Sequence, residues 1–237
     1  MLALLVVLTS CRQEMGQIED QIQVAWETDA VSPIIVPGDP DSVGRLHNIL
    51  LESVWQYVQR SGDTTAVGKK NCIIKYFREH MGMDVRDSFR KSEAYRKDNP
   101  LTYGHALEQS HFQERTRDLL RSLFEAIDRT EDLDLYPVLL EEIRQLEDAA
   151  VMSSIPQAEK TAFRQVSSVA RYSARFWKDK LTNYPLPPQD SGEPLLRYFA
   201  HLHADVLGAL IGIFSGNAAA ESADMSSQMV WYIDAFL

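Results

Sequence analysis

Apolar residues recur every three or four positions over most of the chain, a period that predicts amphipathic helices. The first series begins after Asp41 or Ser42, either of which can cap a helix, and it stops at Ser61 and Gly62. A second helix is expected over the sequence KKNCIIKYFREHM, with its end at Gly82. An amphipathic helix has to bury its apolar face, so these segments predict packing of helix on helix.

The middle of the chain contains two more series. Ser110 and Gln113 match a capping box, in which each side chain bonds an amide of the first helical turn, and an apolar stripe follows them. This stripe consists of Phe112, Leu119, Leu120, Leu123 and Ile127. The sequence DLDLYPVLLEEIRQLEDAA predicts another helix, with Leu139 and Ile143 among its inward residues and Glu147 among its solvated ones. By contrast, residues 83–103 are charged, and the sequence KDNPLTYG at their end is typical of a turn.

Two helical segments complete the chain. One starts at Pro156, which suits a first helical turn, and runs to about Leu181. The other runs from about Leu195 toward the C-terminus, with a possible break near Asn217. Since no segment alternates long enough to predict a strand, we expect an all-α protein, a helical bundle of about six or seven helices.

Prolines mark the segments between these helices. Three of them in the sequence SPIIVPGDPDS predict an extended, Pro-rich N-terminal arm before the first helix. Four more lie in the linker 183–194, where the helical domain 42–237 has a possible subdivision.

The N-terminus has the pattern of a label for export. An apolar run too short to span a bilayer is followed by Leu8-Thr9-Ser10-Cys11 and then by charged residues. This pattern resembles the lipobox of bacterial lipoproteins, although the positive charge that usually starts a signal is missing from residues 1–3. The resemblance implies removal of residues 1–10, lipidation of Cys11, and a tether and arm over 11–41. The alternative is an apolar N-terminal segment that packs on the core.

Charge limits the classes of partner. The 34 acidic residues outnumber the 24 basic ones, for a net charge of −10, so we expect no nucleic acid partner and no electrostatic attachment to an anionic membrane. With only two cysteines, a disulfide framework is not indicated. Lipidation of Cys11 would leave Cys72 single, and its apolar neighbours predict a small buried side chain without catalytic function.

The most regular small-residue pattern lies in the last segment. Residues with little or no side chain occur there at four-residue spacing: Ala200, Ala204, Gly208, Gly212, Gly216 and Ala220. Glycine inside a helix costs about 1 kcal/mol relative to alanine, so the series predicts a compensating close approach of another helix, a glycine zipper. A tight crossing within the bundle is one interpretation, and insertion of this segment into a membrane is the other.

Candidate chemistry is sparse. His201 and Asp205 would share one helical face and are the only candidates for a metal site, whereas His203 would point away from them. The sequence contains no recognised nucleophile or phosphate-binding motif, and we expect no cofactor.

These observations predict a lipid-anchored protein of the bacterial cell envelope, at the outer membrane or the periplasmic face. It would be held by acylated Cys11 and would act by binding an unknown protein or small-molecule ligand. The sequence NPLTYGHAL and the glycine series also resemble uncharacterised all-helical lipoproteins of Bacteroidetes-type bacteria, which implies this location and no activity. Two alternatives stay open: a membrane-active protein that uses the C-terminal glycine zipper, and a metal-dependent hydrolase.

Overall fold

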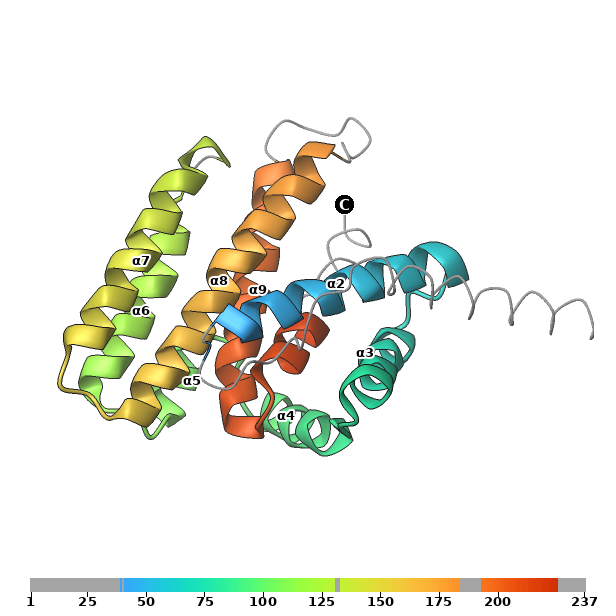
Figure 1. Ribbon diagram of the computed structural model, residues 1–237, viewed down its shortest axis with the longest axis horizontal. Coiled ribbons are helices and arrows are strands. Elements are labelled where there is room, and N and C mark those ends of the chain that lie inside the picture. The colour runs from blue at the N-terminus through green and yellow to red at the C-terminus, as the bar shows by residue number, and fades with distance from the viewer. Residues whose placement is uncertain (1–38, 40, 131–132, 184–192, 226–237) are drawn as a thin grey trace, which may run out of the picture. The chain divides into compact units, whose positions relative to one another are not determined.

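The computed structural model describes residues 39, 41–130, 133–183 and 193–225, and all secondary structure in these ranges is helical (Figure 1). The described residues belong to a single unit, Ile35–Leu237. The predicted signal peptide, Cys11 and most of the predicted arm lie outside the described residues, as does most of the linker 183–194. The predicted all-α class is confirmed.

Eight α-helices follow one another along the described chain: α2 (Asp41–Ser61), α3 (Ala66–Met81), α4 (Arg86–Asp98), α5 (Tyr103–Gln109), α6 (Glu114–Asp128), α7 (Tyr136–Met152), α8 (Gln157–Asn183) and α9 (Glu193–Ser215). A 3-10 turn, Leu133–Leu135, leads into α7. Residues 218–225 are also helical, and we call them the 218–225 helix. The described helices outnumber the expected six or seven because the sequence did not predict α4 and α5 and because the last segment is divided into two helices.

The ends of the first two helices follow from local chemistry. The Thr65 side chain accepts a hydrogen bond from the Gly68 amide over 3.0 Å and so caps the start of α3. Gly62 and Gly82, which follow α2 and α3, have φ angles of 66° and 61°, a left-handed conformation that favours glycine. The predicted ends of both helices are therefore confirmed.

The predicted start of α6 is wrong. Ser110 caps the C-terminus of α5 instead, and its hydroxyl donates to the Leu107 carbonyl over 2.6 Å. Gln113 precedes α6 but makes no side-chain capping bond. The Glu159 carboxylate of α8 takes that role, because it accepts from the Gln113 amide over 3.1 Å and from the Thr116 hydroxyl. A distant residue thus satisfies the Gln113 amide, which the local pattern assigned to the Ser110 side chain.

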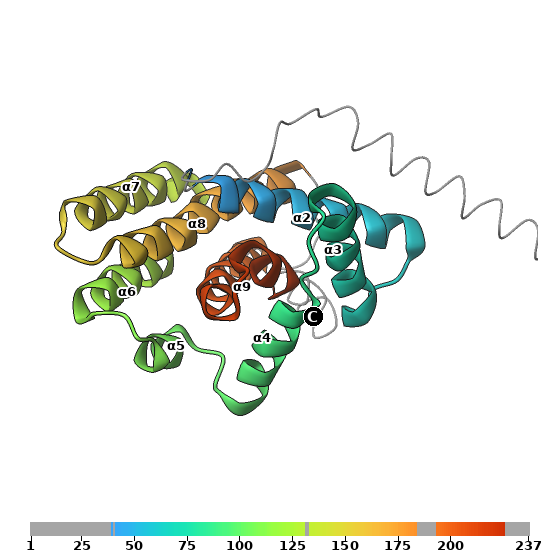
Figure 2. The same cartoon turned by 60° about the horizontal axis from the view of Figure 1, so that its bottom comes forward.

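Helix α9 lies in the middle of the surrounding helices (Figure 2). It packs against α8, α4, α6 and α5, while α2 packs along α8 and α3. Every residue from Ala204 to Leu210 is buried, and because this stretch covers about two helical turns, α9 is covered on all sides there. A helix buried in this way needs little polar surface, which explains its apolar sequence.

Helices α2 and α8 approach closely at Gly44. The Gly44 amide donates to the Ser168 hydroxyl over 3.1 Å, and a Cβ atom at Gly44 would lie 2.6 Å from the Ser168 carbonyl oxygen. Only glycine fits such an approach without displacing backbone. This crossing brings the N-terminal half of α2 against the middle of α8.

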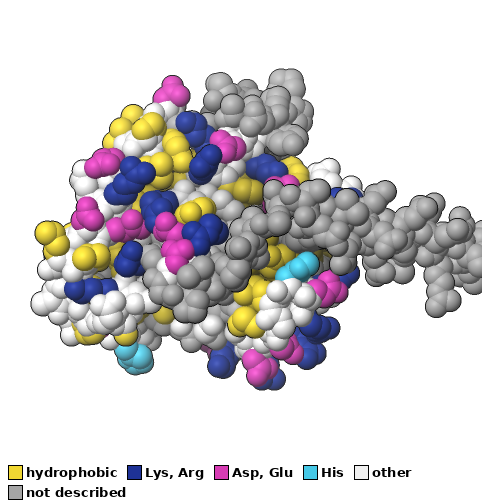
Figure 3. All heavy atoms as spheres, viewed as in Figure 1, with side chains coloured by type: hydrophobic (Ala, Val, Ile, Leu, Met, Phe, Trp, Pro, Cys, Tyr) yellow, Lys and Arg dark blue, Asp and Glu magenta, His cyan; other side chains and the backbone are white. Residues whose placement is uncertain are grey.

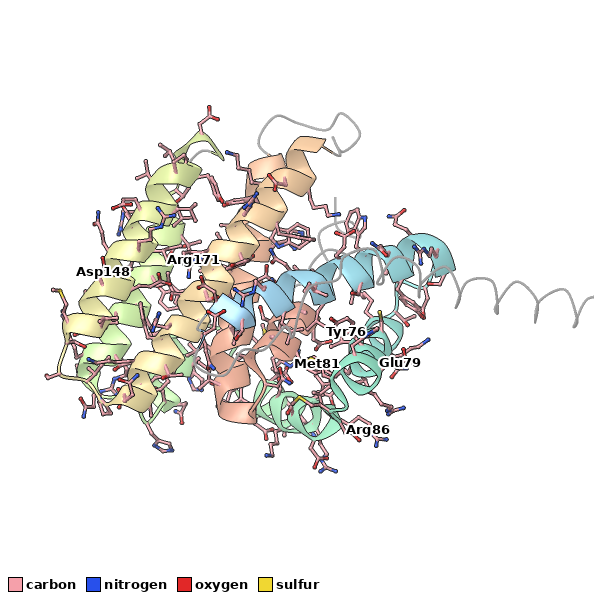
Figure 4. All side chains as sticks on the ribbon, in the orientation of Figure 1. Tyr76, Glu79, Met81, Arg86, Asp148 and Arg171 are labelled. Carbon is pink, nitrogen blue, oxygen red and sulfur yellow. The ribbon has the colours of Figure 1, made fainter. Side chains whose placement is uncertain are left out.

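Arg171 connects three helices beside this crossing (Figure 4). Its guanidinium extends from α8 to Asp41 at the start of α2 and to Glu147 of α7, with Nε 3.0 Å from Glu147 Oε1. The expectation that Glu147 is solvated is therefore wrong, since only 18% of its side chain is exposed. Its carboxylate also accepts from the Ser167 hydroxyl over 2.6 Å, so tertiary contacts cover it.

Candidate functional site

The glycine series is divided between two helices. Helix α9 ends at Ser215, and Gly216 follows with a φ angle of 101°, which reverses the chain direction. Ala200, Ala204, Gly208 and Gly212 lie on α9, whereas Ala220 lies on the 218–225 helix. The six residues therefore do not line one continuous helix, because the four-residue spacing also runs through a turn.

Gly208 and Gly212 form the contact between α9 and the segment that follows. A Cβ atom at Gly208 would lie 2.7 Å from the Ser222 Cα, and one at Gly212 would lie 2.5 Å from the Ala218 Cα. Backbone therefore packs directly on backbone at both glycines. The Ser222 hydroxyl adds a hydrogen bond of 2.7 Å to the Asp205 carbonyl, which fixes the register of the two helices.

Asp205 is the centre of a buried polar cluster. Its side chain is fully buried, and its Oδ2 atom accepts hydrogen bonds from the Ser173 hydroxyl and from Trp177 Nε1, the latter over 2.8 Å. His47 of α2 is also fully buried and places Nε2 3.4 Å from the same oxygen. We call Asp205, Ser173, Trp177 and His47 the Asp205 cluster, in which α2, α8 and α9 meet.

His201 lies on the same side of α9 as Asp205. Its ring stacks on Trp177, with the centroids 4.0 Å apart and the planes 14° apart. His203 faces α6 instead, where Nε2 lies 2.7 Å from Asp128 Oδ1. Both directions agree with the faces that the helical spacing predicts. Among the described residues, no group of three or more His, Cys, Asp or Glu side chains is arranged to hold a metal ion.

Burial limits the chemistry of the Asp205 cluster. Within the described part of the chain, Asp205 Oδ1 and His47 Nδ1 have no hydrogen-bond partner. Burying polar atoms without a hydrogen-bond partner costs free energy. The packing of the three surrounding helices has to offset this cost and hold the atoms in place. A substrate in bulk solvent does not reach a fully buried carboxylate. The cluster is therefore suited to orient helices, whereas substrate chemistry needs an accessible group.

A second group of buried charges joins the 218–225 helix to α4 and α3. Asp224 accepts a hydrogen bond of 3.1 Å from Arg96, whose guanidinium is also 3.9 Å from Glu221. Both carboxyl side chains are fully buried. Lys69 of α3 is buried as well, and its charge is attracted to Asp224 and Asp63.

Burial changes the pKa values in this group. It raises the pKa of Glu221 to about 7, although the Ser92 hydroxyl and Arg96 favour the charged form. Burial also lowers the pKa of Lys69 to about 8, against the opposing attraction of Asp224 and Asp63. Two groups that are normally charged therefore titrate near neutral pH, in side chains that pack around Asp224.

Several of these residues were not identified from the sequence. His47, Ser173 and Arg96 lie far along the chain from their partners, and none belongs to a recognisable motif. The sequence indicated burial of these carboxylates in one way only: Asp205 and Glu221 lie on either side of an uncharged segment. A buried carboxylate requires partners, but the sequence does not say which ones.

Neither a family model, nor a curated protein, nor a solved structure matches the chain. In the ranges that the structure describes, none of the helices combines the length and apolar character needed to cross a membrane.

Proposed function

We propose that the protein is a lipid-anchored component of the bacterial cell envelope and that its helical domain acts by binding. The observation that carries this proposal is the segment Leu8 to Cys11, which matches a lipobox and is followed at once by polar residues. About 30 residues then separate Cys11 from Asp41, where α2 begins. A segment of that length spans up to about 100 Å when fully extended, enough to hold a helical domain away from a bilayer surface.

Mass spectrometry of the N-terminal peptide from cells of the native host tests the anchor. The expected result is a chain that begins at Cys11 and carries acyl groups. Cys11→Ser should move the protein from the membrane fraction to the soluble fraction, whereas Cys72→Ser should leave it in the membrane. An intact Met1 in the isolated protein would refute this assignment.

The exposed apolar side chains support a binding function. Leu135, Val138, Val151 and Met152 lie in or beside α7, and Met152 is 82% exposed. Helix α7 packs against α6 and α8. Over this part of the surface, apolar side chains lie among basic and acidic ones (Figure 3). Exposed apolar patches with a rim of polar residues often mark protein contact sites.

A photo-reactive amino acid at Met152 tests for such a contact in the native host. We expect a cross-linked product of defined mass that is absent when the same amino acid replaces Arg90, which is exposed on α4. Equal products from both positions would show non-specific contact. No product from Met152, Val138 or Val151 would refute a binding surface on α7.

The second candidate is a membrane-active protein, and the position of α9 favours it. This apolar helix is surrounded by other helices and continues through Gly216 into the 218–225 helix. The pair could leave the bundle as one unit because its two parts are joined by backbone packing. Release of dye from liposomes by the Cys11→Ser chain would support this function. No release at any pH between 4 and 9, at about one protein per hundred lipids, would exclude it.

A further inference from the structure

The 218–225 helix is fixed to the rest of the protein by two kinds of contact. Its backbone packs on Gly208 and Gly212 of α9, and its buried carboxyl side chains face Arg96 of α4. Gly216 provides the turn that joins the helix to α9. The apolar contact does not depend on pH, but the contact with α4 depends on the charge of Glu221 and Asp224.

One guanidinium faces both carboxyl groups. Arg96 is 3.1 Å from Asp224 and 3.9 Å from Glu221, so Asp224 has the closer ion pair. When Glu221 is protonated, Arg96 and Asp224 form a balanced pair. When Glu221 loses its proton, a second negative charge is buried beside Asp224, 3.9 Å from a guanidinium that already bonds Asp224, and this state is unfavourable in a low dielectric.

The other cations near these two carboxyl groups lie on α3, and the effect of burial on Glu221 outweighs their attraction. On α3, Lys70 is paired with Glu93 of α4, and Lys69 is attracted to Asp224 and Asp63. On α9, the carboxylate of Asp205 is directed at the Asp205 cluster. On α4, the hydroxyl of Ser92 also acts on Glu221.

We propose that the 218–225 helix is a proton-dependent latch, which is docked on α4 when Glu221 is protonated and is released at higher pH. The sign follows from linkage. The pKa of Glu221 is higher in the docked state, about 7, than its ordinary value of 4.5. The docked state therefore binds the proton more tightly, and the stabilisation is complete below about pH 4.5 and is lost as the pH rises through 7.

Hydrogen–deuterium exchange of the mature-length Cys11→Ser chain between pH 5 and pH 8.5 tests the latch. After correction for intrinsic exchange, protection of amides in 218–225 should fall about 100-fold over this range, because each unit of pKa difference changes the equilibrium tenfold. Protection in the centre of α8 should stay constant. Constant protection of 218–225 in the wild-type chain would overturn the proposal without any variant.

Glu221→Gln supplies the matched comparison, because glutamine has nearly the shape of a protonated glutamate. Protection of 218–225 in this variant should stay high as the pH rises, whereas Glu79→Gln, at an exposed position of α3, should behave like the wild type. If the two variants lose protection equally as the pH rises, Glu221 is not the responsible group and the proposal fails. Should Glu221→Gln not fold, the pH at which the wild-type chain loses protection of 218–225 gives the pKa of Glu221 in the docked state. A midpoint near its ordinary value would also refute the latch.

Discussion

Trp177 of α8 donates its indole N–H to Asp205 of α9 over 2.8 Å, and both side chains lie in the protein core. The same indole ring stacks on His201. Trp177 therefore contacts both His201 and Asp205, the two residues that helical spacing predicts as a possible metal pair. Their proximity is explained by packing and hydrogen bonding, in which the carboxylate accepts bonds from another helix.

Replacement of Asp205 by Ala should strongly destabilise the protein. The change leaves Ser173, Trp177 and His47 buried beside a cavity, and removing one member of a buried polar network typically costs about 3–5 kcal/mol. The free energy of unfolding in urea measures this loss. Asp87→Ala changes an exposed side chain of α4 and should alter the value by less than about 0.5 kcal/mol. Equal effects of the two substitutions would contradict the assigned role of Asp205.

Glycine-to-alanine changes at Gly212 and Gly104 should have opposite effects on the stability of the protein. At Gly212 the added Cβ would lie 2.5 Å from the Ala218 Cα, so we expect a loss of about 1–3 kcal/mol. At Gly104 of α5 a Cβ meets no heavy atom within 4 Å, and alanine should stabilise the helix by about 0.4–1 kcal/mol. Thermal unfolding of both variants checks the difference. A stable Gly212→Ala protein would mean that the 218–225 helix does not pack there.

Arg171→Ala should destabilise the protein more than Arg175→Ala. Arg171 is 19% exposed and joins α8 to Asp41 and Glu147, whereas Arg175 is 75% exposed and lies 3.8 Å from Asp179. Loss of the shielded connection leaves two carboxylates without their cation, at a cost of about 2 kcal/mol. An exposed pair contributes at most about 0.5 kcal/mol. Denaturation midpoints of the two variants should therefore differ clearly, and identical midpoints would contradict this difference.

The thiol of Cys72 should react slowly in the native protein. Burial raises its pKa to about 11 from an ordinary value of 9, so the thiolate fraction at pH 8 falls about 100-fold. The rate of reaction of the Cys11→Ser chain with a disulfide reagent measures this fraction, since Cys72 is then its single thiol. The rate should rise to that of a free cysteine in guanidinium. Equal rates in the two conditions would contradict the shielding of this partly buried thiol.

The helices with a strong apolar period were predictable. Residues Leu119, Leu120 and Leu123 are buried in α6 as their spacing predicts, and α2 ends directly before Gly62, as expected. Helix α4 was not predicted, because RDSFRKSEAYRKD contains too few apolar residues to show a period. Its docking depends on Phe89 and Ser92, which are buried, and that contact becomes visible only in three dimensions.

The candidate sites were less predictable, for two physical reasons. Glycine suits both a close helix contact and a left-handed turn, so the spacing alone did not separate Gly212 from Gly216. The Asp205 cluster also needs His47, which is distant in the chain, and no local rule pairs an aspartate with a particular histidine. Equally, the Gln113 amide bonds Glu159 of α8 rather than Ser110, since an acceptor for an amide at a helix start can come from any helix nearby.

The central position of α9 has a consequence for the order in which the chain is made. The helix that the others surround is encoded after α2 to α8, so these helices are complete before their central partner exists. Until Glu193 and the residues after it emerge, His47, Ser173 and Trp177 have no carboxylate to bind, and the apolar faces around them stay uncovered. A chain that ends at a premature stop codon in the linker would therefore lack the central helix of its core. Such a chain would collapse with exposed apolar surface, and quality-control proteases would recognise it.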